Sequence, residues 1–100
     1  MTSIEMSPEL FNKYAEDKTL KDNNTWLMGQ FLSINSEKNI FPMDKALEIS
    51  RNLCYCYQKC YIVCKEVGEK VPEIDEFLYS FQQKIKKSIE EDEKKLKELN

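Results

Sequence analysis

The fold is decided by residues 43–67, whose sequence is MDKALEISRNLCYCYQKCYIVCKEV. When successive residues are placed about 100° apart, as in an α-helix, the apolar side chains of this stretch fall on one continuous arc. The arc is about 200° wide, against roughly 100° for the stripe of an ordinary surface helix. Ala46 and Leu53 lie near its centre. The stretch therefore predicts a helix that is contacted from more than one side, at the centre of a small bundle.

Two apolar residues, Tyr55 and Ile62, lie on the opposite arc of the same helix, among charged side chains. Arg51, Lys59 and Glu66 are their neighbours on that arc. An aromatic and an aliphatic side chain together on a charged face indicate a contact surface for another protein. These five residues form the predicted partner interface, and ordinary exposure of single apolar residues is the alternative.

Helix start and stop signals on either side of this stretch predict three further helices. Ser7 followed by Pro8 is typical of a helix N-terminus, and Gly68 followed by Pro72 ends one helix and begins the next. The run Asp22-Asn23-Asn24 predicts a turn. The expected helices are residues 7–20, 24–35, 42–67 and 72–97. We expect residues 1–100 to form one domain, an all-α, small antiparallel four-helix bundle with a buried third helix and a long charged C-terminal helix.

Composition narrows the classes of function. With 41% hydrophobic and 33% charged residues, the chain is expected to be globular. A net charge of −3 and a single arginine, Arg51, argue against a nucleic-acid partner. No apolar leader and no long apolar run are present, so we expect neither secretion nor a membrane span. The expected location is the cytoplasm of a cell or of an infected host.

The four cysteines all lie in the central stretch, at Cys54, Cys56, Cys60 and Cys64. The last three are spaced by four residues, so their thiols line one helical face, where they could hold Cu(I) or Zn(II). This spacing resembles the C-x-x-x-C pairs of copper-storing helical bundles and of small mitochondrial import chaperones. Those families place cysteines on further helices, whereas this chain has none outside residues 54–64 and has no histidine. We therefore expect the cysteines to pack as small apolar side chains and expect no metal or other cofactor.

The absence of histidine and of a glycine-rich loop argues against an enzyme. The function that we expect is that of a small acidic module that binds another protein. Compact viral or bacterial inhibitors, immunity proteins and assembly subunits have this general appearance, which is an analogy of fold alone. One alternative is a thiol-based metal-binding bundle. A second is a homodimer subunit that pairs through its last helix, where Leu96 and Leu99 continue an apolar stripe that Asp92 interrupts.

Overall fold

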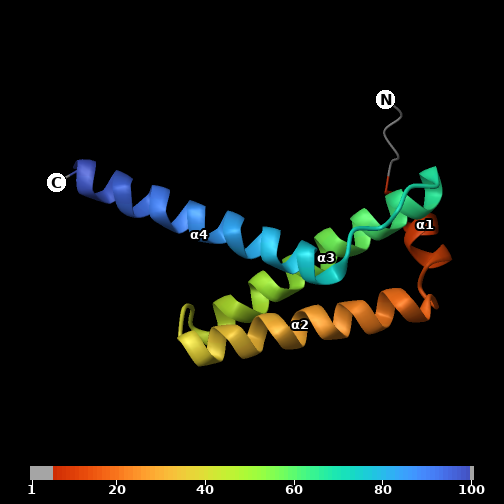
Figure 1. Ribbon diagram of the computed structural model, residues 1–100, viewed down its shortest axis with the longest axis horizontal. Coiled ribbons are helices and arrows are strands. Elements are labelled where there is room, and N and C mark those ends of the chain that lie inside the picture. Colours follow the sequence, from red (N-terminus) through yellow and green to blue (C-terminus); the bar gives the residue numbers. More distant parts are fainter. Residues whose placement is uncertain (1–5, 100) are drawn as a thin grey trace.

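A computed structural model describes residues 6–99, and within this range all regular structure is helical, as the sequence predicts. The four helices form a small bundle (Figure 1). Their bounds are α1 Pro8–Lys13, α2 Lys18–Lys38, α3 Met43–Val67 and α4 Ile74–Leu99. Helix α3 runs in the direction opposite to both α2 and α4, so consecutive long helices are antiparallel (Figure 1).

The first two helices differ from the predicted ranges 7–20 and 24–35. Helix α1 ends at Lys13, and the carboxylate of Asp17 caps α2 by accepting a hydrogen bond from the Leu20 backbone N–H at 3.1 Å. The turn predicted at residues 22–24 is wrong, because these residues lie inside α2. There the Asn23 amide donates to the Tyr57 hydroxyl at 2.8 Å, so a contact with α3 holds a turn-forming residue in helical conformation.

The core lies mainly between α2 and α3. Its buried residues come from three helices: Leu20, Leu27 and Phe31 from α2, Ala46, Leu53, Tyr57 and Tyr61 from α3, and Leu78 from α4. The spacing of four and seven residues places the α2 set and the α3 set each on one face of its helix. Full burial of one such large side chain contributes about 1.5–3 kcal/mol. The α2–α3 pair is therefore the part of the molecule on which the other helices depend.

The loop between α2 and α3 is held by a buried asparagine. The Asn35 side chain is only 4% exposed, and its amide nitrogen donates to the Phe41 carbonyl at 3.1 Å. Its amide oxygen accepts from the Phe41 backbone N–H at 2.9 Å. Asn39 provides the left-handed residue that ends α2, with φ of 51°. These contacts determine where the chain turns to begin α3.

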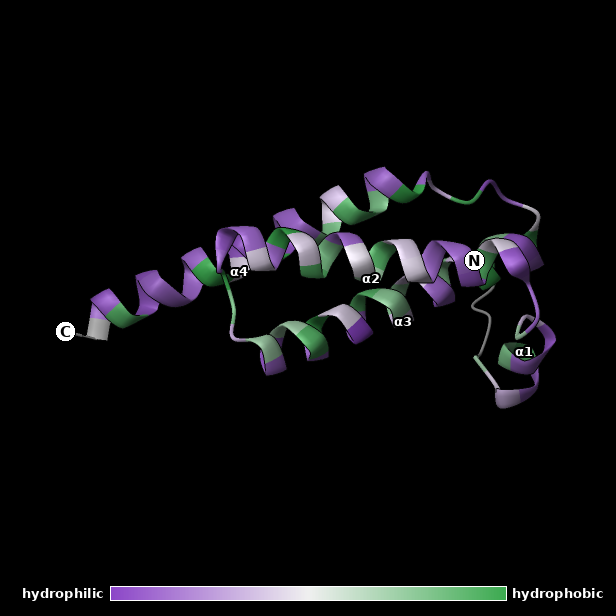
Figure 2. Ribbon diagram, turned by 90° about the horizontal axis from the view of Figure 1, so that it is seen from below, coloured by the Kyte–Doolittle hydropathy of each residue, from purple (hydrophilic) through white to green (hydrophobic). Residues whose placement is uncertain are grey.

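Helix α4 diverges from the α2–α3 pair and projects beyond it (Figures 1 and 2). The molecule measures 50 × 32 × 23 Å, and its Cα radius of gyration is 15.9 Å. A compact domain of this length has a radius of gyration of about 13 Å. The projecting half of α4 is mostly hydrophilic (Figure 2). The divergence leaves the later apolar residues of α4 without full cover from the other helices.

Candidate functional site

Helix α1 of the same chain contacts part of the interface predicted on α3. Tyr55 is 50% exposed, as expected, whereas Ile62 is fully buried at 0% exposure. The prediction that Ile62 lies on an open, partner-facing patch is therefore wrong. Ile62 lies between Tyr55 and Glu66 on one face of α3, and α1 contacts both of these neighbours. The physical reason for its burial is that α1 folds back over this face.

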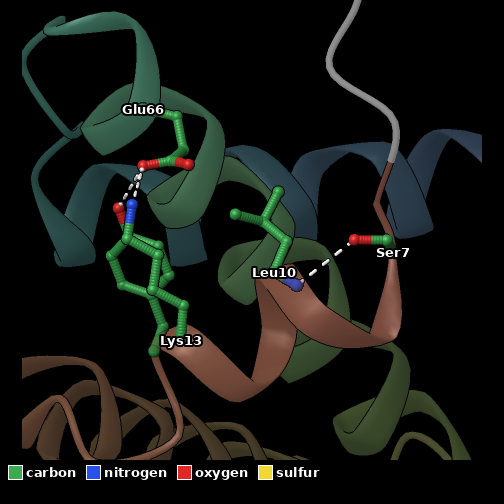
Figure 3. A network of polar contacts seen from close by, with 5 residues as sticks. Ser7, Leu10, Lys13 and Glu66 are labelled. Atoms are coloured by element: carbon green, nitrogen blue, oxygen red, sulfur yellow. Dashed lines mark hydrogen bonds and ion pairs between the residues drawn. The ribbon is translucent and has the colours of Figure 1, made fainter.

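Helix α1 is attached at two points. The Phe11 and Tyr55 rings stack with centroids 6.0 Å apart and an interplanar angle of 22°. At the other end, the Lys13 ammonium and the Tyr14 hydroxyl each donate to Glu66 Oε2 at 2.9 Å. Figure 3 shows Lys13 reaching across to Glu66 on α3. The hydrogen bonds from Lys13 and Tyr14 hold the pKa of the Glu66 carboxyl below its ordinary value, because they stabilise its charged form.

Three further residues of this region, Ser7, Lys59 and Arg51, were singled out in the sequence. The Ser7 hydroxyl accepts a hydrogen bond from the Leu10 N–H at 3.2 Å and caps α1 (Figure 3). The Lys59 ammonium lies 5.4 Å from the centroid of the Tyr55 ring, a cation–π contact. Arg51 is exposed. Of the five predicted interface residues, Tyr55 and Glu66 thus contact α1, Ile62 is buried between them, and Arg51 is open to solvent.

The four cysteines are free and half-buried. Cys54 packs against the core and donates to the Asn24 carbonyl at 3.5 Å, and burial raises the pKa of its thiol. Cys56 lies 3.8 Å from the Asn52 side-chain oxygen. Burial, followed by the neighbouring Cys64, raises the pKa of the Cys60 thiol. The expected core packing thus describes Cys54, while the other three thiols lie outside the core cluster.

The thiols do not converge into a metal site of the usual kind. Within residues 6–99, no group of three or more cysteine, aspartate or glutamate side chains is arranged to hold one metal ion. A single straight helix presents its side chains along a line, whereas a tetrahedral site needs ligands from several directions. The metal-binding alternative therefore receives no support from the geometry of these residues.

A groove lies between α2 and α4, and the sequence pattern did not predict it. Its volume is about 610 Å³. Its apolar lining residues are Phe31, Ile34, Ile40, Phe41, Ile85 and Ile89. Ile40 is 49% exposed and most of the others are half-buried. The signal in the sequence was the apolar stripe of α4, which continues through Ile85 and Ile89 and is longer than the core can cover.

Charged side chains of both signs surround these apolar residues. Lys38 lies on the α2 side, and Lys86, Glu90 and Glu93 lie on the α4 side. All four are exposed. An apolar centre with a charged, solvated rim is the usual anatomy of a protein–protein interface.

Asn35 is the one buried polar residue among those that line the groove, and its side-chain amide already makes hydrogen bonds within the protein. Both ends of its amide are bonded to the Phe41 backbone. Small-molecule sites normally direct a few polar groups at the ligand to orient it. The groove therefore has the character of a docking surface for apolar side chains.

No helix within residues 6–99 has the length and apolar character needed to cross a membrane.

Comparisons with known protein families, with curated proteins and with solved structures find no significant match to this chain. The candidate site thus rests on the geometry of the groove and of the α1–α3 contact.

Proposed function

We propose that the chain is a protein-binding module that holds an amphipathic helix in the groove between α2 and α4. The observation that carries the proposal is the row of six apolar side chains in the groove, most of which stay partly exposed. Partly exposed apolar side chains inside a rim of charged residues are the usual anatomy of a protein–protein interface. A helix with apolar residues at intervals of three and four is the natural complement of a groove between two helices.

The mechanism would be steric. Apolar side chains of the bound helix would enter between Ile34 and Ile89, and the charged rim would select its register. A bound surface of this kind can inhibit, neutralise or assemble the partner without any catalytic step. The four free thiols are compatible with a reducing compartment such as the cytoplasm, where we place this binding.

Site-specific photocrosslinking tests the proposal. A photoreactive phenylalanine analogue at Ile40 places the probe inside the groove, and the same analogue at Tyr79, which is 64% exposed and does not line the groove, is the matched control. We expect the Ile40 probe, in cells of the source organism, to capture a defined protein chain that the Tyr79 probe does not capture. Ile34→Glu should abolish this capture, because a carboxylate in the groove opposes apolar docking.

Two results would contradict the proposal. One is equal capture of the same chain from both probe positions, which would indicate contact without a defined site. The other is capture from Ile40 that Ile34→Glu leaves unchanged, since the apolar wall of the groove would then contribute nothing to binding.

A further inference from the structure

We infer that the helix held in the groove is α4 of a second copy of this chain, paired antiparallel with the first α4 about a two-fold axis. The inference rests on the proposed function and names the occupant of the same groove. It starts from the projecting half of α4, which stands clear of the other helices in two perpendicular views (Figures 1 and 2). A second α4 can lie along this half and reach the groove at its inner end.

The projecting helix carries apolar side chains that the fold leaves uncovered. Ile85 and Ile89 are half-buried in the groove, and Leu96, seven residues beyond Ile89, is 63% exposed. Residues four and seven apart lie on one face of an α-helix. The same face of α4 thus forms a wall of the groove and, further along, presents an apolar side chain of its own. A surface with both features can pair with itself, as an isologous two-fold contact requires.

The charges on this face select the direction of pairing. Lys86 and Glu93 both line the groove. They are seven residues apart, so they lie within about 20° of each other around the helix. In a parallel pair, Lys86 would face Lys86 and Glu93 would face Glu93. In an antiparallel pair whose axis lies midway between them, each Lys86 faces Glu93 of the second copy, and two complementary ion pairs form.

The same two-fold axis also brings apolar side chains of the two copies together. It passes between Ile89 and Glu90, so the Ile89 side chains of the two copies lie next to each other. Leu96 of the second copy then lies opposite Gln83, which lines the groove. Because the Phe31 and Phe81 rings contact each other with centroids 6.5 Å apart, this level of α4 adjoins the Phe31 and Ile34 wall of α2. Leu96 of each copy would fill the inner end of the other copy's groove.

Analytical ultracentrifugation of charge variants tests the pairing. We expect the wild-type chain to sediment as a dimer under reducing conditions. Lys86→Glu places two acids opposite each other, and Glu93→Lys places two bases opposite each other, so each variant should dissociate at least about tenfold more readily. An equimolar mixture of the two variants restores opposite charges across both contacts, and we expect it to form a heterodimer. Lys84→Glu, an exposed change outside the groove, is the matched control and should leave association unchanged.

Three outcomes would overturn the inference: a monomeric wild-type chain, wild-type association in both charge variants, or no recovery on mixing. Circular dichroism of each variant verifies that α4 remains helical. The Ile40 crosslink separates this inference from the proposed function. A monomeric chain whose Ile40 probe captures a different protein, sensitive to Ile34→Glu, overturns the second copy as occupant while the groove keeps its binding function. Absence of any groove-specific capture removes both.

Discussion

Asn35 shows at the residue scale how one buried side chain directs the path of the chain. Its amide satisfies both the N–H and the carbonyl of Phe41, in the loop where α2 gives way to α3. Asn35→Ala leaves both backbone groups without their partners, and each unsatisfied buried group costs about 1–3 kcal/mol. We expect a loss of unfolding free energy of this order or more, measured by urea denaturation. Ser36→Ala, an exposed neighbour, should stay within about 0.5 kcal/mol of wild type.

A second residue-scale prediction concerns Tyr61 and alkaline pH. The Tyr61 hydroxyl donates to both carboxylate oxygens of Asp17 at 3.1 Å. Burial of the phenol, and then the hydrogen bond to Asp17, raise the pKa of Tyr61 from 10.0 to about 12. The folded state thus keeps a proton that the unfolded state loses above pH 10, so the stabilisation is complete below pH 10 and declines as pH rises towards 12.

Urea denaturation between pH 10 and pH 12 tests this prediction for Tyr61. The unfolding free energy of the wild-type chain should fall more steeply with pH than that of Tyr61→Phe, which has no hydroxyl to ionise. Part of the slope should remain in the variant, because burial also raises the pKa of Tyr57. Equal slopes would contradict the role assigned to Tyr61.

At the scale of the element, α1 depends on its contacts with α3 to remain helical. Six residues are too few for a stable isolated helix, and none of them is fully buried. The stack between Phe11 and Tyr55 is one of its two attachments. Tyr55→Asp removes the ring and introduces a charge beneath α1. We expect residues 8–14 to exchange their amide hydrogens faster, while α3 keeps its protection.

Arg51→Ala is the control for this experiment, since Arg51 is exposed on the same helix. It should leave exchange in α1 unchanged. Unaltered protection of residues 8–14 in Tyr55→Asp would show that the aromatic stack does not hold α1.

The second attachment predicts that α1 is released by acid. Hydrogen bonds from Lys13 and Tyr14 lower the pKa of Glu66 from its ordinary 4.5, so Glu66 stabilises the docked state above that pH. The stabilisation declines as pH falls through the lowered pKa. Amide chemical shifts of residues 8–14 should therefore change over this acidic range. In Glu66→Gln the change should be smaller, and an identical titration in the variant would contradict the assignment.

At the scale of the whole molecule, the elongated shape separates a packed body from a projecting helix. Leu78 is 6% exposed in the core, whereas the side chains of residues 94–98 are exposed. Removal of residues 94–100 should change the unfolding free energy of the dilute monomer by no more than about 0.5 kcal/mol. Leu78→Ala, by comparison, should cost about 2–5 kcal/mol. A large loss on truncation, measured below the concentration at which chains associate, would show that the helix end supports the body.

The particular residues show why some features could be predicted and others could not. Gly68 ends α3 in the left-handed conformation, with φ of 75°, as its position after the apolar run indicated. Such signals act within a few residues of the chain. The surroundings of Asn23 and Ile62 depend on residues far away in the chain. Asn23 bonds to Tyr57, 34 positions away, and the buried Ile62 lies between Tyr55 and Glu66, which α1 contacts. The sequence pattern placed one in a turn and the other on an open face, because neither distant contact is visible in local periodicity.

The sequence by itself determined that this protein is helical, that residues 43–67 form its central helix, and that this helix is contacted on more than one side. Local backbone preferences and the period of the apolar residues are sufficient for these features. Only the tertiary structure decided that α1 contacts α3 at Tyr55 and Glu66 and that α4 diverges to leave a groove lined by Ile34 and Ile89. These depend on the angles at which helices pack, which arise from the fit of side chains far apart in the chain.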